Sequence, residues 1–300
     1  MRLVLLVLLS LVSQQLGASV AGLLFDDVGA SAMVALRVVF SAAVLLLVTR
    51  PSRAALAGLG PRGWAAVVGL GLTMAGMNLL IYEAFDRIPQ GVAVTFEVLG
   101  PLALSVLARR RWDAWACAGV ALAGIVLLGR DGFSAGAGAG LDPVGVACAV
   151  GAAACWAGCI LMSRAAGGHL PGVQGLALAM VAGSFLALPI GATTAGPALL
   201  DPVVLGVGLV VAVLSSSLPY GIEMHVLRRM PTALFSLLTC LSPVAAALTA
   251  WAVRGQVLDV PDVAGMLLVV AACAAAVWLG RAPERRMRRA TDRGDRAARA

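Results

Sequence analysis

The chain contains no lysine and little charge of either sign. All 22 of its basic residues are arginine, and charged residues make up only 12% of its 300 residues. Hydrophobic side chains make up 61%, whereas a water-soluble globular protein has about 45–50%. This composition excludes a soluble globular domain. It predicts an all-α integral membrane protein, because helices satisfy their own backbone hydrogen bonds in lipid.

Several chemical signatures are also missing. The two histidines, His169 and His225, are not at metal-ligand spacing from the six cysteines, which all fall within apolar runs. The sequence has no HExxH and no nucleotide-binding P-loop. We therefore predict no enzyme activity, no metal and no cofactor. The arginines lie mostly beside apolar runs, where membrane orientation explains them more simply than binding to nucleic acid.

Ten apolar runs follow one another along the chain, each near the roughly 20 residues that cross a bilayer. They cover residues 3–24, 29–49, 64–82, 90–108, 112–129, 141–163, 173–190, 203–221, 232–253 and 260–279. The first run also resembles a cleavable signal peptide. Gln14 and Gln15 interrupt it, and its removal would break the repeat described below. We therefore interpret it as the first of ten transmembrane helices.

The arginines predict the orientation of these spans. With the N-terminus in the cytoplasm, only Arg87, Arg130 and Arg254 fall outside, and Arg37 lies within a span. All other arginines then face the cytoplasm, including those of residues 281–300, which we expect to form a disordered tail against anionic lipid. The positive-inside rule thus predicts a multi-pass protein of the inner (plasma) membrane with both termini in the cytoplasm.

Two segments of the chain repeat one another. An arginine stands two residues before Pro89, and Pro101 follows twelve residues after that proline. The same pattern recurs 142 residues later at Pro231 and Pro243. By the span count the two copies cross the membrane in opposite directions, which predicts an inverted repeat of five plus five helices. The expected repeats are residues 1–131 and 141–280, joined by a Gly- and Ala-rich linker at 132–140.

Four stretches of sequence carry a family resemblance. They are VGASAMVALR (28–37), GMNLLIYEAFDRIPQGVAVTFEVLGPL (76–102), ACWAGCIL (154–161) and LPYGIEMHVLRRMP (218–231). In these stretches the chain resembles the drug/metabolite transporter superfamily with paired EamA-type domains, and within it the threonine and homoserine exporters. The resemblance implies ten helices, a central cavity between the halves, and a small-molecule substrate, in particular a neutral amino acid.

The chain departs from this family pattern at two positions. Many relatives have glutamate where this chain has Ser242, before Pro243, and where it has Gln256, after Gly255. A coupling role that glutamates at these positions serve in relatives is therefore in doubt here. Two alternatives to amino-acid export stay open: an exporter of other drugs or metabolites, and a membrane receptor or assembly subunit that does not transport.

Arg37 and Glu97 are the sharpest candidates for a functional site. A charge in the middle of a span costs about 2.5–3.5 kcal/mol, so each needs a partner or a watery cavity. Their similar depth permits a salt bridge, which would be a structural pair. In the functional alternative Arg37 binds the carboxylate of the substrate, while Glu97 binds its ammonium group or exchanges a proton with the solution.

Other polar and aromatic residues inside the apolar runs are weaker candidates, since helix packing also explains each of them. They are Gln15, Asn78, Tyr82, Trp156 and Tyr220. Glu223 is a further candidate at the inner end of its span, where simple solvation explains it as readily as function. Pro101 and Pro243 are candidate hinges, because a proline in the middle of a helix frees a backbone carbonyl and bends the helix.

Overall fold

In the computed structural model the described part of the chain covers residues 2–50, 58–109, 112–128, 141–167, 173–227 and 229–297, and these ranges contain helices but no strand. The first half forms α1 (Arg2–Ala21), η1 (Gly22–Leu24), α2 (Phe25–Val28), α3 (Ala30–Thr49), α5 (Pro61–Arg87), α6 (Gln90–Glu97), α7 (Leu99–Arg109) and α8 (Trp112–Leu128). The second half forms α9 (Pro143–Gly167), α10 (Val173–Ala195), η2 (Gly196–Leu200), α11 (Pro202–Ala212), η3 (Val213–Ser217), α12 (Leu218–Leu227), α13 (Thr232–Thr239), α14 (Ser242–Arg254) and α15 (Val260–Ala297). The prediction of an all-α protein is confirmed.

Short signals in the sequence set the helix ends. Asp201 precedes α11, and its carboxylate accepts hydrogen bonds from the N–H groups of Val203 and Val204. Gly29 has a φ of 84° where the chain turns into α3, and Gly255 has a φ of 66° where α14 ends. Glycine adopts such angles without the steric cost that a Cβ imposes.

Eight of the described helical segments are long and apolar enough to cross a membrane. Two further apolar helices, Gln90–Leu104 and Trp112–Leu128, are shorter. They correspond to the fourth and fifth of the ten predicted spans, and at 1.5 Å per residue 17 residues of α8 reach about 25 Å, less than a 30 Å bilayer core. The chain is a multi-pass membrane protein.

The two repeated segments break their helices at the same place. α6 ends at Glu97 and α13 ends at Thr239. These two residues are 142 positions apart, which is the offset of the repeat. The residue that follows has φ −63° and ψ −17° at Val98, and φ −61° and ψ −15° at Cys240. In both copies the next helix begins within two residues and has its proline in the first turn, as expected because proline cannot donate to the carbonyl four residues earlier.

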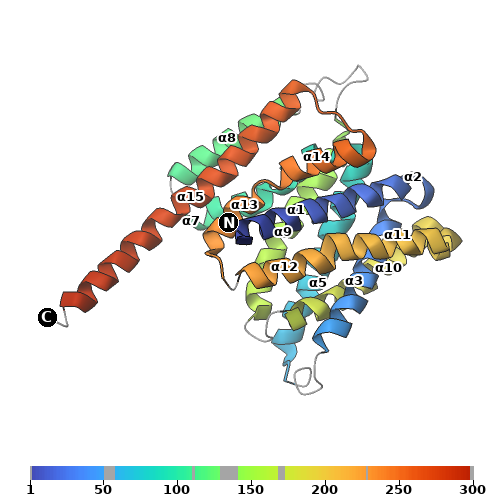
Figure 1. Cartoon of the computed structure of the whole chain (residues 1–300), viewed down its shortest axis with the longest axis horizontal. Helices are drawn as coiled ribbons and strands as arrows, with labels where there is room; N and C mark the ends of the chain where they lie inside the picture. The colour runs from blue at the N-terminus through green and yellow to red at the C-terminus, as the bar shows by residue number, and fades with distance from the viewer. Residues whose placement is uncertain are drawn as a thin grey trace.

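The helices pack in pairs drawn from opposite halves of the chain. α5 lies along α9, α3 lies along α10, and α8 lies along α15. In Figure 1 the α8–α15 pair lies at the edge of the molecule, whereas α1 runs through the middle beside α12 and α14. Every one of these contacts joins segments that are far apart in the sequence, so the two halves interdigitate.

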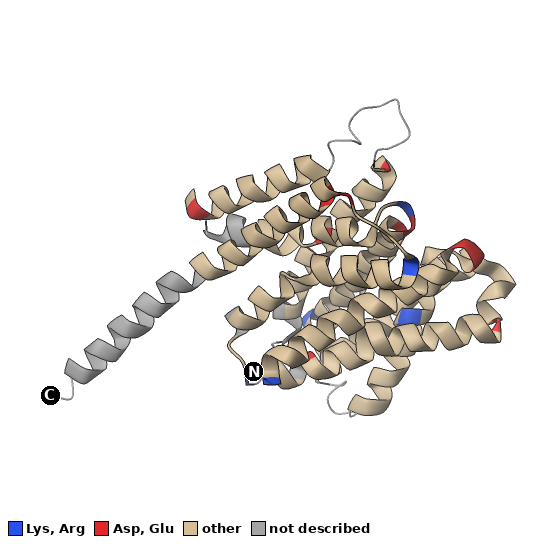
Figure 2. Cartoon of the chain, turned by 45° about the horizontal axis from the view of Figure 1, so that its top comes forward, with Lys and Arg blue, Asp and Glu red and all other residues tan. Residues whose placement is uncertain are grey.

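Figure 2 shows long stretches of helix without charged residues, and most of the charged positions that it colours lie near helix ends. Much of the outer surface is apolar. Large side chains such as Phe185, Trp112 and Val203 are mostly exposed, at 78%, 80% and 66%. Such a surface suits contact with lipid.

The predicted linker at 132–140 lies outside the described residues. α15 continues to Ala297, so the tail is helical as far as that residue and the prediction of a disordered tail is wrong there. Alanine and arginine favour helix, and the transmembrane helix before them supplies the nucleus from which the helix extends.

Candidate functional site

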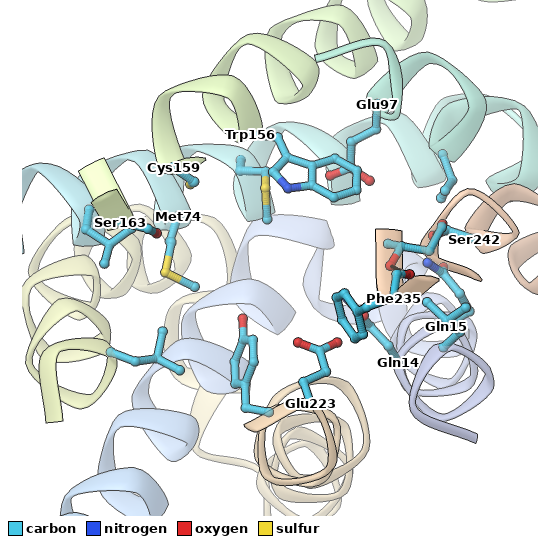
Figure 3. Close-up of a pocket in the computed structure, with 17 residues that line it drawn as sticks. Gln14, Gln15, Met74, Glu97, Trp156, Cys159, Ser163, Glu223, Phe235 and Ser242 are labelled. Atoms are coloured by element: carbon cyan, nitrogen blue, oxygen red, sulfur yellow. Dashed lines mark hydrogen bonds between the residues drawn. The ribbon is translucent and has the colours of Figure 1, made fainter. Parts of the chain in front are cut away.

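A cavity of about 340 Å³ lies among helices of both halves. Residues of α1, α5 and α6 line it from the first half, and residues of α9, α10, α12, α13 and α14 from the second. Figure 3 shows Glu97 and Glu223 reaching into this space from different helices. The volume is at the lower end of the range of about 300–1,000 Å³ for small-molecule sites.

The structure brings five of the eight candidate residues to this cavity. They are Gln15, Glu97, Trp156, Tyr220 and Glu223. Arg37, Asn78 and Tyr82 are not part of its lining. All three are buried in the helix packing behind it, with exposures of 5% or less.

Glu97 is the last residue of α6, and its carboxylate lies beside the indole of Trp156 (Figure 3). Its side chain is only 8% exposed. No hydrogen bond or salt bridge joins it to another residue that the structure describes. An ionised carboxylate that is buried without a partner is costly. Glu97 is therefore available to a proton or to a cationic group of a ligand.

Glu223 is the second carboxylate of the cavity and comes from α12. Its Oε1 atom accepts a hydrogen bond of 3.4 Å from the Ser10 hydroxyl of α1. The sequence alone placed Glu223 at the inner end of a span, where solvation explains it. The structure instead places it on the cavity wall beside Phe235, as Figure 3 shows.

Arg37 does not form the salt bridge with Glu97 that their depths permit. Its Nη1 atom donates to the Tyr82 hydroxyl at 3.1 Å, and its Nε atom donates to Ser216 Oγ at 3.2 Å. Its Nη2 atom donates to the carbonyl of Ser215 at 3.2 Å. The guanidinium also lies 5.4 Å from the centre of the Tyr82 ring. Arg37 thus fastens α3 to α5 and to the eighth span.

The segment that Arg37 holds is a turn of π-helix, Val213–Ser217. Hydroxyl groups on other helices bind carbonyls in and beside this turn: Ser13 donates to the carbonyl of Leu214 at 2.8 Å, and Ser41 donates to that of Ala212, the residue before the turn, at 3.5 Å. In return, the Ser215 hydroxyl donates to the carbonyl of Gln14 at 3.1 Å. A π turn gives up regular α-helical hydrogen bonds, so these contacts from α1 and α3 help to stabilise it.

Tyr82 and Asn78 have local roles on α5. The Tyr82 ring is fully buried and packs between Phe25 and Phe85, with ring centres 5.8 and 5.6 Å away. The Asn78 side chain donates to the carbonyl of Met74 at 2.7 Å, one turn back on the same helix. Neither geometry supports direct contact with a molecule in the cavity.

Gln15 connects the cavity to a polar cluster around Gln90. The Gln90 amide nitrogen donates to the carbonyl and to the side-chain oxygen of Gln15, both at 3.1 Å. Its side-chain oxygen accepts from the Ser19 hydroxyl at 2.8 Å, and its backbone N–H donates to Gln256 at 3.1 Å. Gln90 is fully buried, so the cluster fastens the start of α6 to α1 and to the segment after α14.

The sequence did not identify several polar residues of the cavity wall as site candidates. The clearest are Gln14, Ser163 and Thr239, together with Ser242, which stood out only as a departure from the family pattern. The repeat contained a usable signal for two of them, because 142 residues separate Glu97 from Thr239 and Gln14 from Trp156. Each of these pairs contributes both of its members to the cavity. Within the part of the chain that the structure describes, no three His, Cys, Asp or Glu residues gather as a metal site.

Curated proteins of known function resemble this chain over most of their length. The threonine/homoserine exporter RhtA of Salmonella typhimurium (strain SL1344) is 34% identical over 274 residues, which covers 90% of this chain and 89% of the relative. The protein of the same name from Escherichia coli (strain K12) is 33% identical over the same length and with the same coverage.

A family model and a solved structure add to these relatives. The model of the EamA-like transporter family matches residues 143–278. A solved structure titled only "Crystal structure of protein" matches with a TM-score of 0.59 and covers 93% of this chain and 97% of that one. At 20% identity it supports the fold and nothing more.

Proposed function

Because the chain belongs to the EamA-like transporter family, we propose that it is a secondary transporter that exports small neutral amino acids such as threonine or homoserine across the inner membrane. The relatives are transporters and not enzymes. One observation carries the proposal: a cavity of about 340 Å³ between the two halves holds two carboxylates and hydrogen-bonding side chains. A site of this size between two halves is the expected arrangement for a small transported molecule.

The proposed architecture is ten helices in an inverted five-plus-five repeat, with both termini in the cytoplasm. The matching breaks after Glu97 and Thr239 support it. The packing supports it as well, because exchanging the two halves turns the contact of α5 with α9 into that of α12 with α1. The same exchange maps α3–α10 and α8–α15 onto themselves. The repeats are residues 1–131 and 141–280.

In this proposal the substrate contacts Glu97, Trp156, Tyr220, Gln15 and Glu223. Glu97 binds the ammonium group or carries a proton that couples transport to the ion gradient, and Glu223 is the second candidate for the proton. Pro101 and Pro243 are the hinges, because each frees a carbonyl at a break that borders the cavity. Arg37, Asn78 and Tyr82 support the site from behind and do not touch the substrate.

Counterflow in proteoliposomes tests the proposed function. Purified protein is reconstituted with an internal pool of unlabelled threonine, and uptake of labelled threonine or homoserine is compared with uptake into protein-free vesicles. We expect uptake that requires the internal pool. Exchange of other metabolites without any neutral amino acid would indicate an exporter of different specificity. Binding of the amino acid without flux in sealed vesicles would indicate a receptor.

A further inference from the structure

The charges around the cavity are unbalanced in a way that bears on which end of a substrate is recognised. Glu97 and Glu223 line the cavity, and no basic side chain is among its described lining residues. Arg37, the natural candidate for a carboxylate partner, instead donates to Tyr82, Ser216 and the carbonyl of Ser215. A zwitterion that enters therefore meets two carboxylates and no basic side chain among the described lining residues, and the charge of Arg37 reaches Glu97 only through space.

Glu97 is the residue that calls for a ligand. Its carboxylate is more than nine-tenths buried, faces the cavity and has no hydrogen-bond partner among the described residues. Burial of an unpaired carboxylate is unfavourable, whereas an ammonium group placed against it would form a charge-assisted hydrogen bond in a site of low dielectric constant. The unpaired side chain thus favours a cationic group as the bound partner.

The aromatic side chains of the cavity favour the same kind of group. Trp156, Tyr220 and Phe235 all line it. In Figure 3 the indole of Trp156 lies beside the Glu97 carboxylate, and the Phe235 ring lies beside that of Glu223. The faces of aromatic rings attract cations, most strongly when water is excluded. Each carboxylate thus has an aromatic neighbour that can cover a bound ammonium group.

The carboxylate of a substrate finds only neutral donors. The Gln14 amide and the Tyr220 hydroxyl are on the wall, and neither carries charge. A neutral amide or ester oxygen can accept the same hydrogen bonds as a carboxylate, and it avoids repulsion from Glu97 and Glu223. The negative charge of the substrate therefore contributes little to its binding.

We propose that the cavity recognises its ligand by the ammonium group alone, so that small primary amines and amino-acid amides bind as well as the free amino acid. This inference rests on the proposed export of neutral amino acids and specifies which part of them is read. It also predicts that acidic amino acids, which carry a second carboxylate, are excluded by repulsion.

Competition with matched threonine derivatives tests the inference in the counterflow assay. Threonine amide keeps the ammonium group and loses the negative charge, whereas N-acetylthreonine keeps the carboxylate and loses the positive charge. At neutral pH, where the amines are still largely protonated and the test does not itself drive the cavity carboxylates to their neutral form, we expect threonine amide to inhibit within about threefold of threonine and N-acetylthreonine to be at least about tenfold weaker. The inference is overturned if threonine amide is tenfold weaker than threonine, or if N-acetylthreonine inhibits as well as threonine does.

A binding measurement separates this inference from the proposed function. Bound ligand raises the unfolding temperature of purified protein. We expect threonine amide to raise it in the wild type and not in Glu97→Gln. Glu83→Gln is the matched control, because Glu83 lies away from the cavity in an exposed pair with Arg87 at 2.8 Å. If threonine is not exchanged but this binding pattern holds, export of threonine is wrong and ammonium recognition stands. If threonine is exchanged and Glu97→Gln still binds the amide, ammonium recognition is wrong and export stands.

Discussion

Glu97 and Thr239 occupy equivalent positions in the two halves and line the same cavity. Each is the last residue of a short helix, α6 or α13, and each is followed by a break and a proline. The carbonyl of Thr239 accepts a hydrogen bond from the Ser242 hydroxyl, which gives the freed carbonyl of the second copy a partner. The repeat thus places a carboxylate on one side of the cavity and a hydroxyl on the other.

This asymmetry predicts unequal effects of substitution. We expect Glu97→Gln to lower threonine counterflow at least about tenfold, because the only fixed charge at that break is lost. Thr239→Val should lower it by no more than about two- to fivefold, because the Thr239 hydroxyl already donates to the carbonyl of Phe235 at 2.9 Å and can only accept one neutral hydrogen bond from a substrate. Initial rates in proteoliposomes are the measurement, with matched protein content checked by gel. Wild-type rates in Glu97→Gln together with an inactive Thr239→Val would contradict this division of roles.

The sequence predicts much of the fold for an identifiable reason. Spans in lipid must be apolar helices, so the apolar runs locate most of the helices, and the prolines locate the two breaks. The pairing of Arg37 was not predictable. Its partners include a backbone carbonyl of a π-helical turn, and no periodicity in the sequence reveals that turn.

The site residues illustrate the same limit. Glu97 and Trp156 stand out in apolar runs and do line the cavity, whereas Asn78 and Tyr82 stand out equally and do not. Which face of a helix meets the cavity depends on packing between helices distant in sequence. The repeat identifies Thr239 from Glu97 when the residues between the two prolines of each copy are compared.

The crossing of α8 and α15 provides a test of packing. A Cβ atom added at Gly124 would lie 2.7 Å from the carbonyl oxygen of Gly265, and one added at Gly265 would lie 2.7 Å from that of Gly124. Gly124→Ala should therefore push the helices apart and destabilise the protein by about 1–3 kcal/mol, as overpacking does. Thermal unfolding in detergent measures this. Gly119→Ala on the same helix is the control, since nothing lies within 4 Å of its added Cβ. Equal stability of the two variants would contradict the close crossing.

Gln256 provides a test of the junction at the start of α6. Its side-chain oxygen accepts the Gln90 N–H at 3.1 Å, as a capping residue would. Gln256→Glu keeps the acceptor and adds negative charge at a helix N-terminus, so we expect a gain of about 0.3–1 kcal/mol. Gln256→Leu removes the acceptor and should cost about 0.5–2 kcal/mol. Unfolding temperatures of the two variants should fall on opposite sides of the wild type. A destabilised Gln256→Glu would show that the amide nitrogen, and not the oxygen, matters.

The proposed orientation predicts the result of reporter fusions. A reporter fused after Leu279 should behave as cytoplasmic, because the positive-inside rule places that end of α15 inside. A reporter inserted at 132–140 should behave as external. An insertion between the first two spans is less useful as a reference, since it lies next to the closely packed start of α3. The opposite assignments at the two sites would overturn the ten-helix topology.

A final prediction concerns the stability that Arg37 provides. Its three hydrogen bonds go to Tyr82, Ser216 and the carbonyl of Ser215, all buried groups. Arg37→Leu leaves these partners unsatisfied, at a cost of about 1–3 kcal/mol for each that finds no replacement. The variant should therefore unfold at a clearly lower temperature than the wild type.

A double-mutant cycle shows whether that stability depends on Glu97. If the two residues formed a buried ion pair, adding Glu97→Leu would recover much of the about 3–5 kcal/mol that a broken pair costs. Because Arg37 and Glu97 share no hydrogen bond, we expect no such rescue. The control cycle pairs Arg37→Leu with Tyr82→Phe, which removes the hydroxyl that Arg37 binds at 3.1 Å. That pair should be less than additive by about 1 kcal/mol, since both changes remove the same hydrogen bond. Rescue by Glu97→Leu with additivity at Tyr82 would mean that the ion pair forms in the membrane after all.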